Sequence, residues 1–261
     1  IKYKDGSSGK VYKITEANLS AQVQDDFVEA GGVKRGTYFS IVKADGTPAE
    51  NGASLLAEYA RVKALGLTLD ADTRYTLYIP AGQYDLTADL VVDTPYLDVR
   101  SLNGECSVYL TTKTINVTAD YVNVTGIDVG TQTFKGCKNL ANIVITNCKG
   151  AGNYSFGGGG TVSGTFENCT GGYQSFGGNG GEASGTFTNC VSGDDSFGGG
   201  GGIASGTFEN CIGGDDSFGG GGGIASGIFL WCRLTAGSFP TPTGAGKQRM
   251  CLNADYTEVN A

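Results

Sequence analysis

The stretch that decides the fold is SGDDSFGGGGGIASGTFENC, residues 192–211, in which seven of the twenty positions are glycine. A near-copy of this stretch follows at residues 213–232. Glycine loses more backbone entropy on folding than any other residue, so such a segment is a poor helix and a poor isolated strand. A folded protein that repeats the segment must therefore offset this entropy through contacts between the copies.

Cysteine marks the length of the repeat. Five cysteines recur at an even spacing of twenty-one, four of them follow an asparagine, and two phenylalanine series keep the same period. Registration of several residue types at one period indicates a repeat architecture. The columns consist of Cys148, Cys169, Cys190, Cys211 and Cys232; Asn147, Asn168, Asn189 and Asn210; Phe166, Phe187, Phe208 and Phe229; and Phe176, Phe197 and Phe218.

A unit of this length fits one rung of a parallel β-solenoid. Helical repeats need apolar residues at a period of about 3.6, whereas these segments are short and alternate between apolar and polar residues. In IVITNC, residues 143–148, we expect Ile143 and Ile145 to point inward and Asn147 to turn a corner before Cys148. A corner of one residue needs a left-handed backbone, which asparagine and glycine tolerate best. Gly126 stands at the same corner one rung earlier.

The rung before that is less regular. YLDVRSLNG, residues 96–104, matches the pattern at a spacing of twenty-five instead of twenty-one. It predicts that Leu97, Val99 and Leu102 point into the solenoid and that Ser101 stands at the corner.

The asparagine corner and the alternating strand before it resemble the right-handed parallel β-helix of the pectate-lyase-like superfamily. ADGTPAENGASLLAEYARVKAL (residues 44–65), followed by TLYIPAGQYDL (residues 76–86), is similar to the capping helix and first strand of that family. The resemblance implies an all-β, right-handed parallel β-helix of about seven or eight rungs with an N-terminal capping helix. We expect the helix at residues 53–65, with Asn51 as its N-cap and Gly66 at its end. The glycine-rich repeats also resemble those of structural and fibre proteins of tailed bacteriophages.

Four segments follow from this pattern. Residues 1–45 predict a small N-terminal β module, with a hairpin around DGSSG and a further strand in TYFSIVKADG. Such a module is either an attachment piece or an extra cap on the solenoid. Residues 46–71 hold the capping helix, residues 72–240 the β-helix, and residues 241–261 a C-terminal tail. In the tail, Met250, Leu252 and Tyr256 are candidates to cover the C-terminal end.

The amino-acid composition limits the classes of function that we expect. The formal net charge is −8 and histidine is absent. Phosphate-backbone recognition needs clustered lysine and arginine, so we expect no nucleic-acid partner. No apolar run approaches the ~20 residues of a membrane-spanning helix, so we expect no membrane insertion. The lack of histidine removes the commonest general base near neutral pH.

The acidic pairs of two consecutive rungs are the candidate metal ligands. Asp194 and Asp195 lie one repeat before Asp215 and Asp216, so the four carboxylates are expected to stack. Calcium prefers oxygen ligands and would neutralise them, and the family resemblance implies calcium held by surface aspartates. The alternative, which we favour, is that Asp-Asp-Ser forms a turn whose charges are solvated. Calcium is the only cofactor that the sequence suggests.

The cysteine column allows three interpretations. Neighbouring rungs bring Cα atoms to about 4.8 Å, within the range of disulfides. Parallel side-chain directions, however, fit poorly with a disulfide torsion near ~90°, and no metal-ligand spacing such as C-x-x-C accompanies the column. We therefore predict buried reduced thiols that act as small apolar groups.

The combined interpretation is a structural protein. The β-elimination that the family resemblance implies needs a basic residue near calcium, and no lysine or arginine lies between Lys149 and Arg233. We therefore expect a non-enzymatic structural or adhesive protein on a virion surface: a phage fibre, a head fibre or a tail-associated protein. The N-terminal module would bind other virion proteins. Further expected partners are a second or third copy of the chain, through the glycine runs at residues 198–202 and 219–223, and a surface glycan.

Two alternatives remain open. One is a carbohydrate-binding or carbohydrate-cleaving, polysaccharide-lyase-like β-helix with a calcium site at the four aspartates. The other is a subunit of a cellular surface filament, which would place the chain outside the cell or on its surface.

Overall fold

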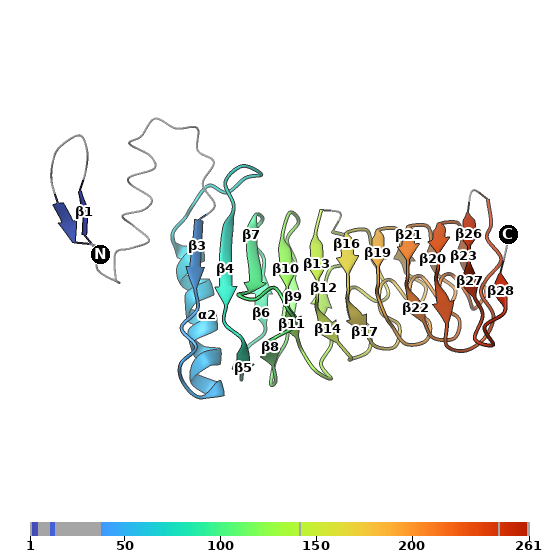
Figure 1. The fold of residues 1–261 in the computed structure, drawn as a ribbon, viewed down its shortest axis with the longest axis horizontal. Helices are drawn as coiled ribbons and strands as arrows, with labels where there is room; N and C mark the ends of the chain where they lie inside the picture. The colour runs from blue at the N-terminus through green and yellow to red at the C-terminus, as the bar shows by residue number, and fades with distance from the viewer. Residues whose placement is uncertain (1, 5–10, 14–37, 141, 245, 260–261) are drawn as a thin grey trace.

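The protein is a parallel β-solenoid of about eight turns with rungs of about 21 residues. The computed structural model describes residues 2–4, 11–13, 38–140, 142–244 and 246–259. Figure 1 shows the rungs stacked side by side along one axis, with helix α2 at one end and strands β26–β28 at the other. The predicted solenoid and its rung length are confirmed.

One long sheet runs the whole length of the solenoid, and we call it sheet B. Its ten strands pair in parallel, and from β10 to β24 each residue pairs with its counterpart one repeat later. The strands, in spatial order, are β3 (Tyr38–Ile41), β4 (Tyr75–Ile79), β7 (Leu97–Ser101), β10 (Asn123–Thr125), β13 (Val144–Thr146), β16 (Thr165–Glu167), β19 (Thr186–Thr188), β21 (Thr207–Glu209), β24 (Ile228–Leu230) and β26 (Lys247–Arg249).

Shorter sheets form the other two sides. The side that follows the asparagine corner contains β5 (Gly82–Tyr84), β8 (Val108–Leu110), β11 (Ile127–Asp128), β14 (Lys149–Gly150), β17 (Thr170–Gly171), β22 (Ile212–Gly213), β25 (Arg233–Leu234), β27 (Cys251–Leu252) and β28 (Glu258–Val259). The remaining side contains β6 (Leu90–Val92), β9 (Ile115–Val117), β12 (Lys135–Gly136), β15 (Thr161–Val162), β18 (Glu182–Ala183), β20 (Ile203–Ala204) and β23 (Ile224–Ala225).

The corners are as the sequence predicts. Asn147 has a φ of 53° and Gly126 a φ of 78°, both in the left-handed region. Ile143, Ile145 and Cys148 are buried, with exposed fractions of 1% or less. The one-residue turn therefore does what the repeat spacing requires: it changes the direction of the chain without an inserted loop.

Helix α2 (Pro48–Ala64) starts earlier than expected. Thr47 is the N-cap, in a capping box with Glu50, and Pro48 occupies the first turn, where its missing N–H costs nothing. The prediction of Asn51 as the cap is wrong: Asn51 is buried in the helix, and its Nδ2 donates to the carbonyl of Gln83. The expected end is correct, because Gly66 follows with a φ of 62°.

Helix α2 and strand β3 together cover the N-terminal end of the solenoid. The helix packs on the first rung near β5, so closely that a Cβ on Gly52 would overlap the carbonyl oxygen of Asp85. Strand β3 pairs in parallel with β4 and extends sheet B. The strand that the sequence assigned to the N-terminal module thus belongs to the solenoid. The predicted hairpin is present, with β1 (Lys2–Lys4) antiparallel to β2 (Val11–Lys13); the rest of residues 1–37 lies outside the described part.

The core changes character along the axis. Aliphatic residues such as Val99 and Val124 fill the first rungs, whereas phenylalanines fill the later ones. Rings in one column stack at 4.9 Å, as between Phe176 and Phe197, and they meet the rings of the other column edge-on. This alternation of parallel and edge-on contacts is a favoured aromatic arrangement. The column that contains Phe176 and Phe197 begins at Phe134 and Phe156 and continues to Phe239.

Two irregular places correct the sequence analysis. Leu102 is 47% exposed, because residues 102–107 form an extra loop and Val108 takes the inward position opposite Ile127. In the C-terminal segment, Met250 and Tyr256 are exposed instead of covering the end. The chain there forms one more rung, with β26 and β27, and the antiparallel strand β28 covers β27.

No helix in the described part of the chain has both the length and the apolar character of a membrane span.

Candidate functional site

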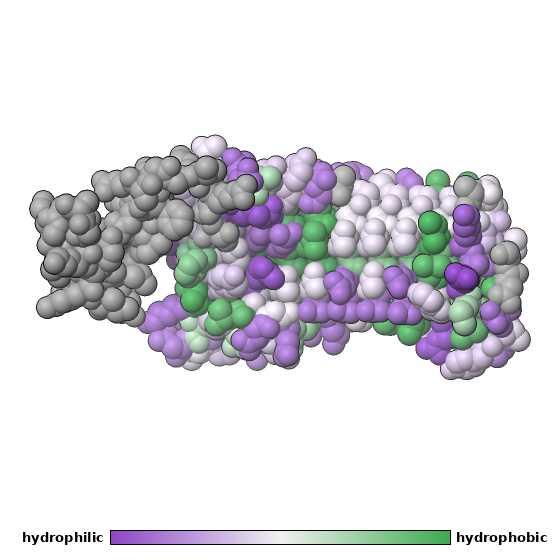
Figure 2. All heavy atoms as spheres, turned by 45° about the horizontal axis from the view of Figure 1, so that its top comes forward, coloured by the Kyte–Doolittle hydropathy of each residue, from purple (hydrophilic) through white to green (hydrophobic). Residues whose placement is uncertain are grey.

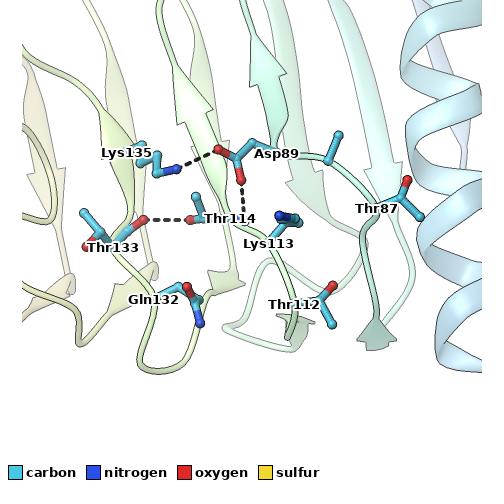
Figure 3. A pocket seen from close by; sticks show the side chains of 9 residues that line it. Thr87, Asp89, Thr112, Lys113, Thr114, Gln132, Thr133 and Lys135 are labelled. Carbon is cyan, nitrogen blue, oxygen red and sulfur yellow. Dashed lines mark hydrogen bonds and ion pairs between the residues drawn. The ribbon is translucent and has the colours of Figure 1, made fainter.

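A polar groove opens on the side of the solenoid where the early rungs differ in length. It encloses about 460 Å³ and lies where the chain passes from β5 to β6, from β8 to β9 and from β11 to β12. Figure 3 shows side chains from three successive rungs around it. The lining residues are Thr87, Ala88, Asp89, Thr112, Lys113, Thr114, Gln132, Thr133 and Lys135.

Part of the lining is held in place by hydrogen bonds. Asp89 accepts from the Lys135 ammonium at 2.8 Å and from the backbone N–H of Thr114 at 3.2 Å (Figure 3). Partial burial opposes ionisation of Asp89, but Lys135 and the Thr114 N–H outweigh it and hold the pKa of the carboxyl below its ordinary value. The Thr114 hydroxyl donates to the carbonyl of Thr133 at 2.8 Å. These contacts connect the three rungs across the groove.

Three other polar side chains of the lining are free to bind a ligand, whereas the hydroxyls of Thr112 and Thr133 donate to backbone carbonyls. The side chains of Thr87, Lys113 and Gln132 have no hydrogen bond or ion pair to any residue that the structure describes. Because Lys135 neutralises Asp89, the Lys113 ammonium leaves the lining with a formal charge of +1, in a chain of net charge −8. The groove is thus a locally positive site with hydroxyl and amide groups beside it.

The acidic pairs do stack, but they are occupied with the backbone and with neighbours. Asp194 Oδ1 accepts from the backbone N–H of Asp215 at 2.8 Å, and Asp195 Oδ2 accepts from the Tyr173 hydroxyl at 2.9 Å. Asp195 and Asp216 have φ values of 53° and 51°, so both stand at tight turns. Among the described residues no group of three or more His, Cys, Asp or Glu side chains is placed to hold a metal. The calcium site stays a prediction without support from this geometry.

The cysteine column consists of free, buried thiols, as predicted. Each thiol lies within hydrogen-bond distance of one backbone carbonyl on the preceding rung and one on its own rung; for example, Cys169 Sγ is 3.3 Å from the oxygens of Ile145 and Glu167. Burial raises the pKa of the Cys148 and Cys190 thiols. The column extends by one member that the sequence analysis missed, Cys251, because the last rung is shorter than the others.

The asparagine column forms a ladder on the surface. Asn168 Nδ2 donates to Asn147 Oδ1 at 3.1 Å, and Asn189 Nδ2 donates to Asn168 Oδ1 at 3.0 Å. All four members have φ between 51° and 53°. Asn168 and Asn189 therefore combine two roles: each tolerates the left-handed corner, and its amide donates to the asparagine of the preceding rung.

Several glycines of the repeat leave room for the backbone of a neighbouring rung. A Cβ on Gly185, Gly206 or Gly227 would overlap the carbonyl oxygen of the equivalent glycine one rung earlier. Gly201 and Gly222 are different, because they are exposed and adopt φ values of 88° and 89°. The predicted contact surface on the glycine runs is untested and stays a prediction.

Sequence reasoning missed the groove and one buried column. The groove residues have no motif in common, and they meet only because the loops of three rungs overlap. The hydroxyl groups of Ser155, Ser196 and Ser217 accept backbone N–H groups inside the turns. Ser196 and Ser217 are spaced by one repeat, which is a visible signal in the sequence.

Comparison of the chain with protein-family models, with curated proteins and with solved structures finds no match. The fold and the local chemistry are therefore the basis for a functional proposal.

Proposed function

We propose that the chain is a non-enzymatic structural and adhesive protein displayed on a virion surface, as a fibre, a head fibre or a tail-associated protein. The observation that carries this proposal is the unbroken stacking along the axis. In the repeated rungs, contacts within the phenylalanine, cysteine, asparagine and serine columns connect neighbouring rungs. Repeats whose interfaces all stabilise one another form a stiff element, which is what a displayed rod requires.

The finer family assignment is part of the same proposal. The asparagine corner and the α2 cap support membership of the pectate-lyase-like β-helices, and the glycine-rich rungs support a kinship with phage fibre proteins. The N-terminal residues would bind other virion proteins, and the solenoid would point away from the particle. A cellular surface filament is the remaining structural alternative.

Localisation tests this proposal directly. Antibodies raised against the whole chain, followed by gold labelling in electron microscopy, should decorate purified particles from the source of the sequence. Labelling of the envelope of uninfected cells, with unlabelled particles, would replace the virion with the cellular filament. Antibodies against an unrelated protein of the same particle control for the integrity of the preparation.

A second candidate function, glycan binding, is favoured by the groove. Free Lys113, Gln132 and Thr87 side chains offer a positive charge, an amide and a hydroxyl to one ligand. Sugar hydroxyls bond to amide and hydroxyl groups, and a carboxylate on the sugar would pair with the ammonium. An acidic oligosaccharide is therefore the class of ligand that these groups fit best.

Calorimetry with acidic and neutral oligosaccharides of equal length checks this candidate. We expect binding of the acidic set only, and about tenfold weaker binding for Lys113→Ala. Lys149→Ala is the matched control, since that lysine lies outside the groove lining. Unsaturated products formed from polyuronides would instead establish the lyase alternative, and a rise of the melting temperature with millimolar calcium would restore its metal site.

A further inference from the structure

The outward face of sheet B changes at its C-terminal end. On strands β16, β19 and β21 the outward residues are threonine and glutamate, whereas β24 presents Ile228 and Leu230 and β26 presents Lys247 and Arg249. In Figure 2 the surface of the middle rungs is mostly pale, and towards the C-terminal end it becomes green (hydrophobic) and then purple (hydrophilic). The repeat is thus broken on the surface although the core beneath it continues.

Three strands form an ordered strip, which we call the β24 strip. Glu209, Leu230 and Arg249 are register partners on β21, β24 and β26, and so are Thr207, Ile228 and Lys247. The strip therefore has an apolar centre, a negative charge one rung to one side and two positive charges one rung to the other.

The apolar centre is accessible and continues around the corner. Ile228 is 43% exposed, and the next corner carries Trp231 and Met250, which are 46% and 53% exposed. The Trp231 indole N–H points at the Met250 sulfur at 3.2 Å. Exposed aromatic and aliphatic residues that gather at one place on a polar surface are typical of a contact site.

The charges of the strip have no partner within the described part of the chain. Glu209, Lys247 and Arg249 make no side-chain hydrogen bond or ion pair with any residue there. The strand β24 separates the positive strand from the negative one, about 9.6 Å across at two rung spacings. These groups are available to a second surface.

The geometry points to a second copy of this chain as the occupant of the β24 strip. The two sheets would meet face to face, related by a twofold axis parallel to β24 that passes between them. Such a rotation keeps the strand direction and reverses the order of the rungs. Ile228 and Leu230 then meet their own counterparts, and Arg249 of each copy meets Glu209 of the other, so that the ion pair forms twice.

The alternative twofold axis, parallel to the solenoid axis, is disfavoured by charge. It would keep the order of the rungs and reverse the strands, and Lys247 would then face Arg249 of the second copy. Like charges in direct opposition weaken an interface. The charge pattern therefore selects the dimer in which the two solenoids run antiparallel.

The strip is only three strands wide, so the area it can bury is smaller than the ~800 Å² per partner of a standard interface. We expect a reversible dimer whose population rises with protein concentration. This contact does not depend on the virion proposal, because it needs only the described surface.

Sedimentation velocity of the full chain over a concentration series tests the contact. The native chain should shift from monomer to dimer, and Leu230→Glu should remain monomeric throughout. Val144→Glu is the matched control, since it makes the same kind of change at a 38% exposed position of sheet B outside the strip. Circular dichroism and melting curves confirm that each variant is folded.

Charge exchange tests the orientation. Glu209→Arg and Arg249→Glu should each weaken dimerisation by about tenfold, and the double variant should restore it. A native chain that stays monomeric at its highest soluble concentration, or a dimer that survives Leu230→Glu, would overturn the proposal. A dimer strengthened by Arg249→Glu alone would overturn the antiparallel arrangement.

Discussion

The first half of the solenoid, residues 75–150, and the second half, residues 151–239, continue the same sheet B with different side chains in the core. The core of the first half consists mainly of aliphatic residues, and its rungs differ in length. More residues separate Val99 from its register partner Val124 than separate Val124 from Ile145. The second half repeats phenylalanine, cysteine, alanine and glycine at a nearly constant period.

The difference shows that strict repetition allows close stacking, whereas rungs of unequal length leave room for a groove. In the second half identical residues stack, which allows ring-on-ring contacts at 4.9 to 5.0 Å and very close backbone approach. In the first half the segments that join β5 to β6, β8 to β9 and β11 to β12 differ in length, and their side chains surround the polar groove. Regular rungs thus provide stiffness, and irregular rungs provide a concave surface.

The largest expected effect is on the close approach of glycines in the second half. Gly206→Val should lower the free energy of unfolding by at least about 5 kcal/mol, because even its Cβ would overlap the carbonyl oxygen of Gly185. Urea unfolding measures the loss.

The control for close packing is Gly221→Asn. Gly221 has a φ of 64°, and Asn179, two repeats earlier, already adopts a φ of 53° at the equivalent position. We expect a cost below about 1 kcal/mol for this control, because asparagine tolerates the left-handed region. Equal costs for the two variants would contradict close packing as the reason for glycine.

The aromatic core gives the second largest effect. Phe197→Ala should cost about 3–5 kcal/mol, since it removes a ring stacked at 4.9 Å on both Phe176 and Phe218. Val124→Ala, in the aliphatic half, should cost about 2 kcal/mol. Both are measured by chemical denaturation. If the two costs proved equal, the stacked rings would add nothing to ordinary burial.

A pH effect of intermediate size should come from the thiols. Burial, with a smaller contribution from Asp128, raises the pKa of Cys106 from 9.0 to about 11, so the unfolded chain loses this proton first as the pH rises. The stabilisation is complete below pH 9 and is lost as the pH rises through about 11. Melting temperatures measured across this window should fall by several degrees more for the native chain than for Cys106→Ser. A flat profile for both proteins would argue against this linkage.

The smallest expected effect concerns the asparagine corners. Asn189→Ala should cost about 1–2 kcal/mol, because alanine disfavours a φ of 52° and cannot donate to Asn168. Asn189→Gly should cost less, since Gly126 occupies the same kind of corner in the first half. Thermal melting of the two variants ranks them; a less stable glycine variant would show that the amide ladder outweighs the backbone preference.

Much of the fold could be predicted from residue spacing. The constant period predicts the rung, and alternation within IVITNC predicts which side chains are buried and where the chain turns. The failures fall where the spacing changes or where two local signals compete. Leu102 lies outside because the loop at residues 102–107 has no counterpart in later rungs. Asn51 can cap a helix, but the box of Thr47 and Glu50 satisfies two backbone donors at once and starts the helix one turn earlier.

By itself, then, the sequence determined the solenoid, its rung length, its asparagine corners and its buried thiol and phenylalanine columns, because a strict repeat forces equivalent residues into equivalent positions. Only the tertiary structure decided where Thr87, Lys113 and Gln132 meet, and that Glu209 and Arg249 lie on either side of an apolar strand on one face. Those juxtapositions depend on loop lengths and on the change of residue type at the last rungs. A periodic sequence pattern does not predict the positions that depart from it. Both candidate contact sites, the polar groove and the β24 strip, consist of residues that depart from the repeat.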